Sequence, residues 1–351
     1  MVAPFTFTLP PELSAKEPPE RRGIRRDQVR LLVIERATGE IEHTRFDKIG
    51  NYLRQNDLLV FNSSRTLPAS MRGCDCSALH GPCMEVRLAE HLPDDSWLAL
   101  LLCEQGDPFG CGLRAGMQIE FAEGLNAAVL ARDANIPRLW KLRFSITGIE
   151  LVDLIYRLGK PIRYEYISTP WDLDYYQTVY AREPGSAEMP SAGRAFTWRL
   201  LLDLKRRGID RAYVVLHAGL SSYMDDEIDR QHPASEEEYF VNRITAGKIN
   251  RTRESGGRVI AVGTTVVRAL ESTVNEKGGV SETHGYTRLK IDNQHQLRSV
   301  DGLLTGLHEP EASHLDLLTA FLPVEQIYAA YREAIARRYL WHEFGDLNLI
   351  L

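Results

Sequence analysis

The chain has 351 residues, of which 44% are hydrophobic, and this length is enough for two hydrophobic cores. Its net charge of −6 argues against binding nucleic acid over the whole surface, although a local basic patch remains compatible with it. The sequence has no stretch of about 18 apolar residues and no secretory signal, and its five cysteines favour a reducing compartment over a disulfide framework, so we expect a cytoplasmic protein without a membrane span.

The N-terminal part predicts a hairpin, a short helix and a further strand. Residues 21–30 first bring five arginines together, which either contact phosphates or form a solvated charge run. Apolar and alternating residues at 31–34 and 40–43 then flank a turn typical of a hairpin. Residues 46–53 place apolar side chains on one helical face, and 57–62 predict a buried strand.

Between residues 69 and 148 the pattern changes to short, evenly spaced apolar runs. These runs are separated by turn residues and show no helical periodicity. They lie at residues 84–88, 97–101, 117–121 and 139–144. This spacing predicts a small antiparallel β-barrel or sandwich. We expect it to form a domain inserted into a larger one, which is made of residues 1–68 and 149–351.

The inserted region also contains the one spacing that resembles a metal site. Cys74, Cys76, His80 and Cys83 place four zinc-competent side chains within ten positions. The spacing is cramped and lacks paired Cys-x-x-Cys units, so we expect no metal and keep zinc as the minority alternative.

After residue 148 the chain alternates between predicted helices and strands. This alternation indicates an α/β fold, with a mostly parallel sheet and helices on both faces. The predicted helices are 149–158, one that Thr197 caps, 243–254, 313–321 and 324–339, and the predicted strands are 211–217, 259–262 and 299–305.

The strand–turn–helix at residues 256–271 is the strongest local signal. Gly263 ends an apolar strand, and Thr264 or Thr265 is placed to cap the following helix, which we expect to stop near residue 278. A helix start of this kind attracts anions, and Arg268 with Glu271 lies one turn further on. The alternative is a well-capped unit with a surface Arg–Glu pair. The glycine spacing excludes a Walker loop and a dinucleotide fingerprint.

Ligands of such folds bind at the carboxyl ends of the strands. Three groups fall at predicted strand ends: His217, Gly263 with the threonines at 264 and 265, and residues 305–308, which include His308. We therefore expect these groups to converge on one site.

A set of motifs occurs in a fixed order along the chain, at residues 9–13, 31–33, 39–43, 58–62 with Arg65 and Pro68, 176–186, 262–271, 301–305, 330–335 and 345–346. In these motifs and their order the chain resembles the S-adenosylmethionine:tRNA ribosyltransferase-isomerase family of queuosine biosynthesis over essentially its whole length.

The resemblance implies an α/β domain with an inserted β-barrel, and an unusual use of S-adenosylmethionine. As co-substrate, it would donate its ribosyl part to a deazaguanine base in the tRNA anticodon loop. Isomerisation would give epoxyqueuosine, with adenine and methionine released. This chemistry needs a base that removes a proton beside the sulfonium, groups that hold adenine, and an anchor for a carboxylate. An exposed RNA loop would be read by stacking and basic contacts. We expect a monomer.

The chain departs from the family pattern at several polar positions. Histidines of the family are replaced at Ala195 and Ser235, and segments 287–291, 293–295 and 306–310 differ as well. Two alternatives therefore stand beside the family reaction. One is a divergent paralogue that uses S-adenosylmethionine or a related nucleoside on another acceptor. The other is a non-catalytic RNA- or nucleotide-binding protein.

The retained motif residues define the predicted site. His217 is the preferred general base, because it follows an apolar strand and precedes a turn with a glycine. The other expected catalytic residues are His308 and Asp301. The expected substrate-binding residues are Arg65, Gln177, Thr178, Gly193, Gly263, Thr264, Thr265 and Arg268.

Overall fold

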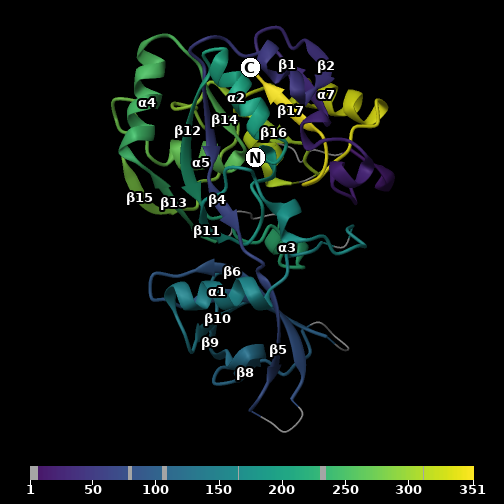
Figure 1. Cartoon of the computed structure of the whole chain (residues 1–351), viewed down its shortest axis with the longest axis vertical. Helices are drawn as coiled ribbons and strands as arrows, with labels where there is room; N and C mark the ends of the chain where they lie inside the picture. Colours follow the sequence, from purple (N-terminus) through teal and green to yellow (C-terminus); the bar gives the residue numbers. More distant parts are fainter. Residues whose placement is uncertain (1–6, 78–80, 105–108, 165, 230–234, 311) are drawn as a thin grey trace.

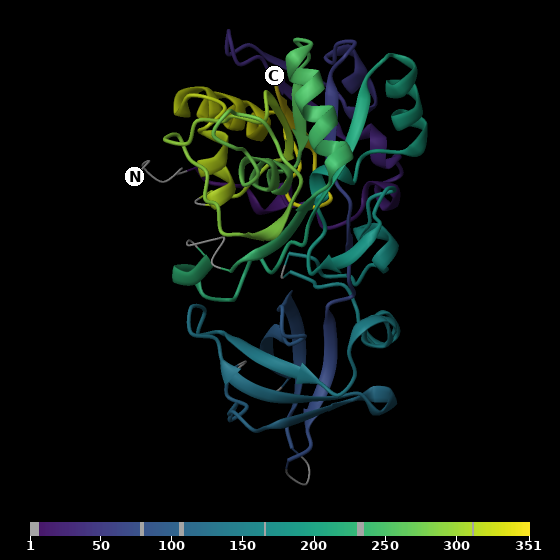
Figure 2. The ribbon, with the colours of Figure 1, turned by 90° about the vertical axis from the view of Figure 1, so that its left-hand side faces the viewer.

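The computed structural model describes residues 7–77, 81–104, 109–164, 166–229, 235–310 and 312–351. Two bodies follow one another along the long axis of the molecule, a nine-stranded sheet with its helices and a closed six-stranded barrel (Figure 1). The view turned by 90° shows the barrel at the same end, joined to the sheet by a few chain segments (Figure 2).

The large sheet is parallel at its centre and antiparallel toward its edges. Strands β12, β3, β14 and β16 are mutually parallel, as are β17 and β1, and the remaining pairs are antiparallel. The fold is therefore α/β with a mixed sheet. Its order is β15 (Thr283–Thr287), β13 (Glu237–Val241), β12 (Asp210–Leu216), β3 (Leu58–Asn62), β14 (Val259–Val262), β16 (Gly302–Gly306), β17 (Leu347–Ile350), β1 (Arg30–Ile34), β2 (Ile41–Arg45).

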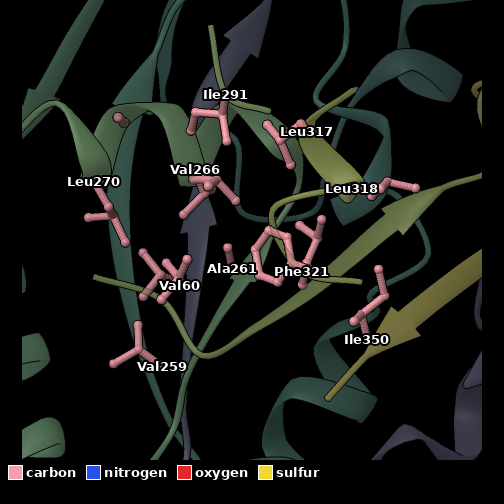
Figure 3. Packing of buried hydrophobic residues seen from close by; sticks show 14 of the residues in the cluster. Val60, Val259, Ala261, Val266, Leu270, Ile291, Leu317, Leu318, Phe321 and Ile350 are labelled. Atoms are coloured by element: carbon pink, nitrogen blue, oxygen red, sulfur yellow. The ribbon is translucent and has the colours of Figure 1, made fainter. Parts of the chain in front are cut away.

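Helices cover both faces of the sheet, as the sequence predicts. Because side chains alternate along a strand, Val60 and Ala261 face one core, while Leu59 and Ile260 face the other. Figure 3 shows part of the first core, with Val60 and Ala261 beside Val266 of the helix that follows β14. Buried residues of α4 (Arg243–Glu254), α5 (Thr264–Glu271), α6 (Ser313–Leu318) and α7 (Val324–Ala336) join this first core, and those of α2 (Trp198–Arg206) and η4 (Phe46–Asn51) join the second.

The predicted inserted barrel is confirmed as a closed antiparallel barrel. Helix α1 (Gly148–Leu158) leaves it, and Leu151 and Ile155 of this helix pack into the barrel core. The domain boundaries given above remain a prediction. The barrel order is β10 (Leu139–Phe144), β7 (Trp97–Cys103), β6 (Cys83–His91), β5 (Ser70–Asp75), β8 (Gln118–Phe121), β9 (Asn126–Arg132).

The cysteines correct the expectation that this chain has no disulfide framework. Cys74 of β5 and Cys83 of β6 lie opposite each other and form a disulfide, and Cys103 pairs with Cys111. Two of the four candidate zinc ligands are therefore bonded to each other, and Cys76 is left free. His80, the fourth candidate, lies outside the described residues. Within the described ranges no group of three or more His, Cys, Asp or Glu side chains is arranged to hold a metal.

The arginines between positions 21 and 30 are held by the protein's own groups. Arg22 donates to the carbonyl of Phe344 at 2.9 Å, and Arg30 pairs with Asp346 at 3.3 Å. These contacts tie the N-terminal chain to the C-terminal one, so the segment is not a fully solvated charge run.

A two-stranded parallel ribbon, β4 (Ser64–Thr66) and β11 (Glu183–Ser186), lies between sheet and barrel. None of the helices in the described part of the chain is long and apolar enough to cross a membrane. The remaining short elements are α3 (Asp226–Asp229), η1 (Pro11–Leu13), η2 (Pro19–Arg22), η3 (Arg26–Gln28), η5 (Ala122–Gly124), η6 (Leu173–Tyr176) and η7 (Ser191–Gly193).

Candidate active site

A cavity of about 680 Å³ lies at the carboxyl ends of β14 and β16. The first residues of α5 and the chain after β16 form one part of its wall, and residues of segments 187–192 and 218–222, with Tyr164, Tyr166, His342 and Glu343, form much of the rest. This cavity is where an open α/β sheet is expected to bind a ligand.

The start of α5 brings Gly263, Thr264 and Thr265 into the cavity wall. Gly263 has φ 99°, a conformation that favours glycine, and its N–H donates to the carbonyl of Leu304 at 2.8 Å. Gly263 itself is the N-cap, and no side chain caps the helix, so the predicted threonine caps are wrong. The helix also ends at Glu271 rather than near residue 278.

Arg268 occupies the cavity wall, but it is not the predicted surface residue. Its guanidinium forms a buried ion pair with Glu237 of β13, and its Nε donates to the carbonyl of Leu289 at 3.0 Å. Glu271 does not contact Arg268 and instead accepts hydrogen bonds from the backbone of Ser299. The expectation fails because other chain segments cover α5 on all sides, so that the helix has almost no exposed residues.

His308 is the predicted imidazole that lies in the cavity wall. Its Nε2 is 2.9 Å from Thr305 Oγ1, and its ring stacks on His314 with centroids 4.8 Å apart. Burial, together with the neighbouring histidines, holds the pKa of His308 well below its usual range. The ring is therefore neutral near pH 7 and can donate or accept one hydrogen bond.

Two half-buried carboxyl groups in the cavity wall were missed by the sequence interpretation. Glu188 accepts a hydrogen bond from the backbone N–H of Ser221 at 2.6 Å, and burial raises its pKa to about 8. Glu343 accepts from the hydroxyl of Tyr166, and burial raises the pKa of Glu343 as well. Glu188 directly precedes the family-like segment 189–196, which could have drawn attention to it, whereas no signal marks Glu343.

Aromatic rings line the cavity beside these acids. Tyr166 stacks on His342 with centroids 4.0 Å apart, and Tyr164 lies next in the same stack at 6.2 Å from Tyr166. Burial lowers the pKa of His342 to about 4, so this ring is neutral as well. The cavity thus offers a flat aromatic wall, two neutral imidazoles and two carboxyl groups that hold their protons unusually tightly.

The structure separates His217 from this group. Its ring lies in the lining of a different cavity, and Nδ1 is 2.8 Å from Ser64 Oγ. Burial lowers its pKa. Gly185 packs against the ring so closely that an added Cβ would lie 2.4 Å from it. The expected convergence of three strand ends therefore holds for two of them, at 263–265 and 305–308.

The remaining predicted site residues lie outside the cavity lining. Asp301 accepts from the backbone N–H of Val259 at 2.8 Å and joins β14 to the chain before β16. The side-chain amide of Gln177 bonds both backbone groups of Thr66, and Thr66 does line the cavity. The other three residues are Arg65, whose guanidinium lies over the Tyr156 ring, and Thr178 and Gly193, which pack with Tyr180.

The fold and this cavity define an α/β protein with an inserted β-barrel and an acid-bearing pocket at its strand ends. The family model described as "Queuosine biosynthesis protein" matches residues 2–350, and the chain belongs to this family.

Two relatives of similar length share the name S-adenosylmethionine:tRNA ribosyltransferase-isomerase. The S-adenosylmethionine:tRNA ribosyltransferase-isomerase of Carboxydothermus hydrogenoformans is 37% identical over 350 residues, covering 99% of this chain and 98% of the relative. That of Symbiobacterium thermophilum is 38% identical over 353 residues, with 99% and 98% covered. The crystal structure of S-adenosylmethionine tRNA ribosyltransferase from Thermotoga maritima shares 32% identity, covers 99% of each chain and superposes with a TM-score of 0.55.

Proposed function

We propose that this protein is an enzyme that transfers and isomerises the ribosyl part of S-adenosylmethionine onto a deazaguanine base in the tRNA anticodon loop, giving epoxyqueuosine. Adenine and methionine leave in the process. The observation that carries the proposal is the half-buried carboxyl group of Glu188, whose pKa is raised, in a cavity at the carboxyl ends of the strands, in a chain of this family.

The cavity matches the three parts of the donor. The α5 N-terminus, with the Thr264 hydroxyl beside it, suits the methionine carboxylate, since free N–H groups at a helix start attract anions. The stacked rings of Tyr166 and His342 suit the flat adenine. The carboxyl groups of Glu188 and Glu343, once ionised, supply the negative charge that suits the sulfonium cation.

Glu188 is the better general base for the proton on the carbon beside the sulfonium. A carboxylate with a pKa of about 8 is a stronger base than a buried imidazole whose pKa is lowered. Charge favours it as well, because Glu188 becomes neutral when it takes the proton, whereas His308 would become a buried cation. We therefore assign proton removal to Glu188.

His308 then acts as a neutral hydrogen-bonding group. Thr305 Oγ1 holds Nε2, and the ring lies in the wall between the α5 N-terminus and His314. Such a ring can hydrogen-bond a ribose hydroxyl or the departing adenine without carrying charge. Asp301 and His217 position the strands and the ribbon around the cavity.

The test is to incubate the protein with S-adenosylmethionine and tRNA bearing the aminomethyl-deazaguanine. We expect adenine release together with formation of the modified base. Solvent deuterium should exchange into the donor methylene group, since proton removal precedes transfer. The matched controls are tRNA with guanine at the same position and the isosteric variant Glu188→Gln.

Two results would contradict the proposal. Adenine release without modification of this tRNA would indicate the paralogue that uses another acceptor. RNA binding without adenine release under any condition would indicate a binding protein that lacks catalytic activity.

A further inference from the structure

A second cavity lies on the other side of the ribbon formed by β4 and β11. It measures about 1080 Å³, and we call it the groove. Three segments, 63–66, 183–187 and 217–218, each begin in the groove lining and end in the lining of the candidate active site. At about 3.3 Å per extended residue, the first two segments span roughly 10–13 Å and the third, two adjacent residues, only about 3 Å, so the two linings adjoin.

The groove exposes three large apolar side chains. Trp198, at the first turn of α2, is 52% exposed, and Ile244, at the first turn of α4, is 73% exposed. Phe240 of β13, which also lies in the lining, is 38% exposed. Apolar side chains gathered in this way on one surface mark an interaction site.

The groove is also basic, although the protein is acidic overall. Lys205 and Arg211 lie in its lining and form no salt bridge with any carboxylate that the structure describes. Nη1 of Arg211 is buried and lacks a hydrogen-bond partner among the described residues. Arg182 and Lys248 are balanced by neighbouring carboxylates, at 3.4 Å and 2.8 Å, so the surplus charge comes from Lys205 and Arg211.

We infer that the groove binds the single-stranded nucleotides next to the modified base of the RNA substrate. The inference rests on the proposed function, since it takes RNA as the substrate. Aromatic side chains that stack with bases and cations that contact phosphates together form the usual surface for single-stranded RNA. Uncompensated cations favour a polyanion over a second copy of this chain, whose net charge is −6. Because the two linings adjoin, nucleotides bound in the groove would lie next to a base held in the candidate active site.

The experiment measures binding of an anticodon stem–loop RNA by fluorescence anisotropy at several salt concentrations. We expect Trp198→Ala to weaken RNA binding about 5–100-fold through lost stacking. We expect Lys205→Glu to weaken it and to reduce the slope of log affinity against log salt by about 0.7 or more. The matched control is Lys277→Glu, an equal charge change at an exposed residue outside the groove lining.

Two further measurements separate the possible outcomes. Calorimetric binding of S-adenosylmethionine should not change in either groove variant, which shows that the candidate active site is intact. Sedimentation velocity reports the oligomeric state. Wild-type RNA affinity in both variants overturns the inference, and dissociation of a dimer by Trp198→Ala assigns the groove to a second copy instead. If the wild-type protein binds RNA and yet releases no adenine, weaker RNA binding by the groove variants would support RNA binding in the groove. The absence of adenine release would then contradict the proposed function.

Discussion

Arg268 of α5 and Glu237 of β13 form an ion pair inside the wall of the candidate active site, with side-chain exposures of 7% and 5%. The pair joins the helix after β14 to an antiparallel edge of the sheet. Moving either charge out of water costs free energy, and the attraction between the guanidinium and the carboxylate offsets that cost. The sequence suggested an exposed arginine free to hold a ligand, whereas the structure gives it a buried partner.

Replacing Arg268 by alanine should therefore act on stability first. The variant leaves the carboxylate of Glu237 buried and unpaired, and we expect the free energy of unfolding to fall by about 3–5 kcal/mol. Urea denaturation followed by circular dichroism measures this loss. The double variant Arg268→Ala/Glu237→Ala should recover part of it. A loss below about 1 kcal/mol would mean that the pair behaves as an exposed one.

The assignment of Glu188 as general base predicts the pH dependence of the reaction. The carboxylate form is the active one, so kcat/KM should rise as the pH increases toward about 8 and level off above it. Glu188→Gln should lower turnover by about 10²–10⁴-fold and abolish this dependence. Adenine release measured on both sides of pH 8 tests both points. A wild-type profile in the Gln variant would assign the base elsewhere.

The same carboxyl group should also affect stability in a defined direction. Its pKa is raised from 4.5 to about 8 in the folded protein, so the folded state keeps a proton that the unfolded chain has released in this interval. Its contribution to stability is complete below pH 4.5 and is lost as the pH rises through 8, on the order of a few kcal/mol in total. Thermal unfolding of Glu188→Gln should lack this part of the pH dependence.

Replacing His308 and replacing His217 should affect the reaction to different extents. His308 lies in the cavity wall, and His308→Ala should slow adenine release by about 10²–10³-fold, as for loss of one catalytic hydrogen bond. The sequence favoured His217 as the base, with a loss of about 10²–10⁴-fold on replacement. Because its ring faces the groove, we expect His217→Ala to have the smaller effect on deuterium exchange into the donor. The opposite order would restore His217 as the base.

The disulfide between Cys74 and Cys83 should affect the stability of the barrel and not the reaction. Replacing both by serine removes a cross-link over nine residues and should destabilise the protein by about 2–3 kcal/mol. Adenine release at a temperature where the barrel stays folded should be retained, because both cysteines belong to barrel strands outside the cavity lining. Loss of activity on addition of a metal chelator would contradict this prediction and return attention to zinc.

Local patterns made most of the architecture predictable. The hairpin of β1 and β2, helices α1, α2 and α4, and the strands of the barrel with clear alternation were all expected from periodicity and turn residues. Strands β5 and β9 were missed, because one carries Arg72, Gly73 and Cys74 and the other is rich in alanine. Short edge strands such as β15 carry little apolar pattern of their own.

The candidate site was less predictable, because its chemistry depends on burial. The motif at Gly263–Thr265 led to the right place, since a strand that turns into a helix is visible in the sequence. Nothing local shows that Arg268 is covered or that Glu188 lies out of water. Both depend on segments far away in the chain, such as β13 and the loop at Ser221.

The position of β17 has a consequence for synthesis on the ribosome. This strand is made of residues 347–350, and it lies between β16 and β1, bonded to both. Until residues 347–350 emerge from the exit tunnel, β1 and β2 cannot join the other strands through β17. The barrel, whose strands end at Phe144, has no such dependence and can close earlier. The nascent chain should therefore acquire its barrel before it completes its sheet.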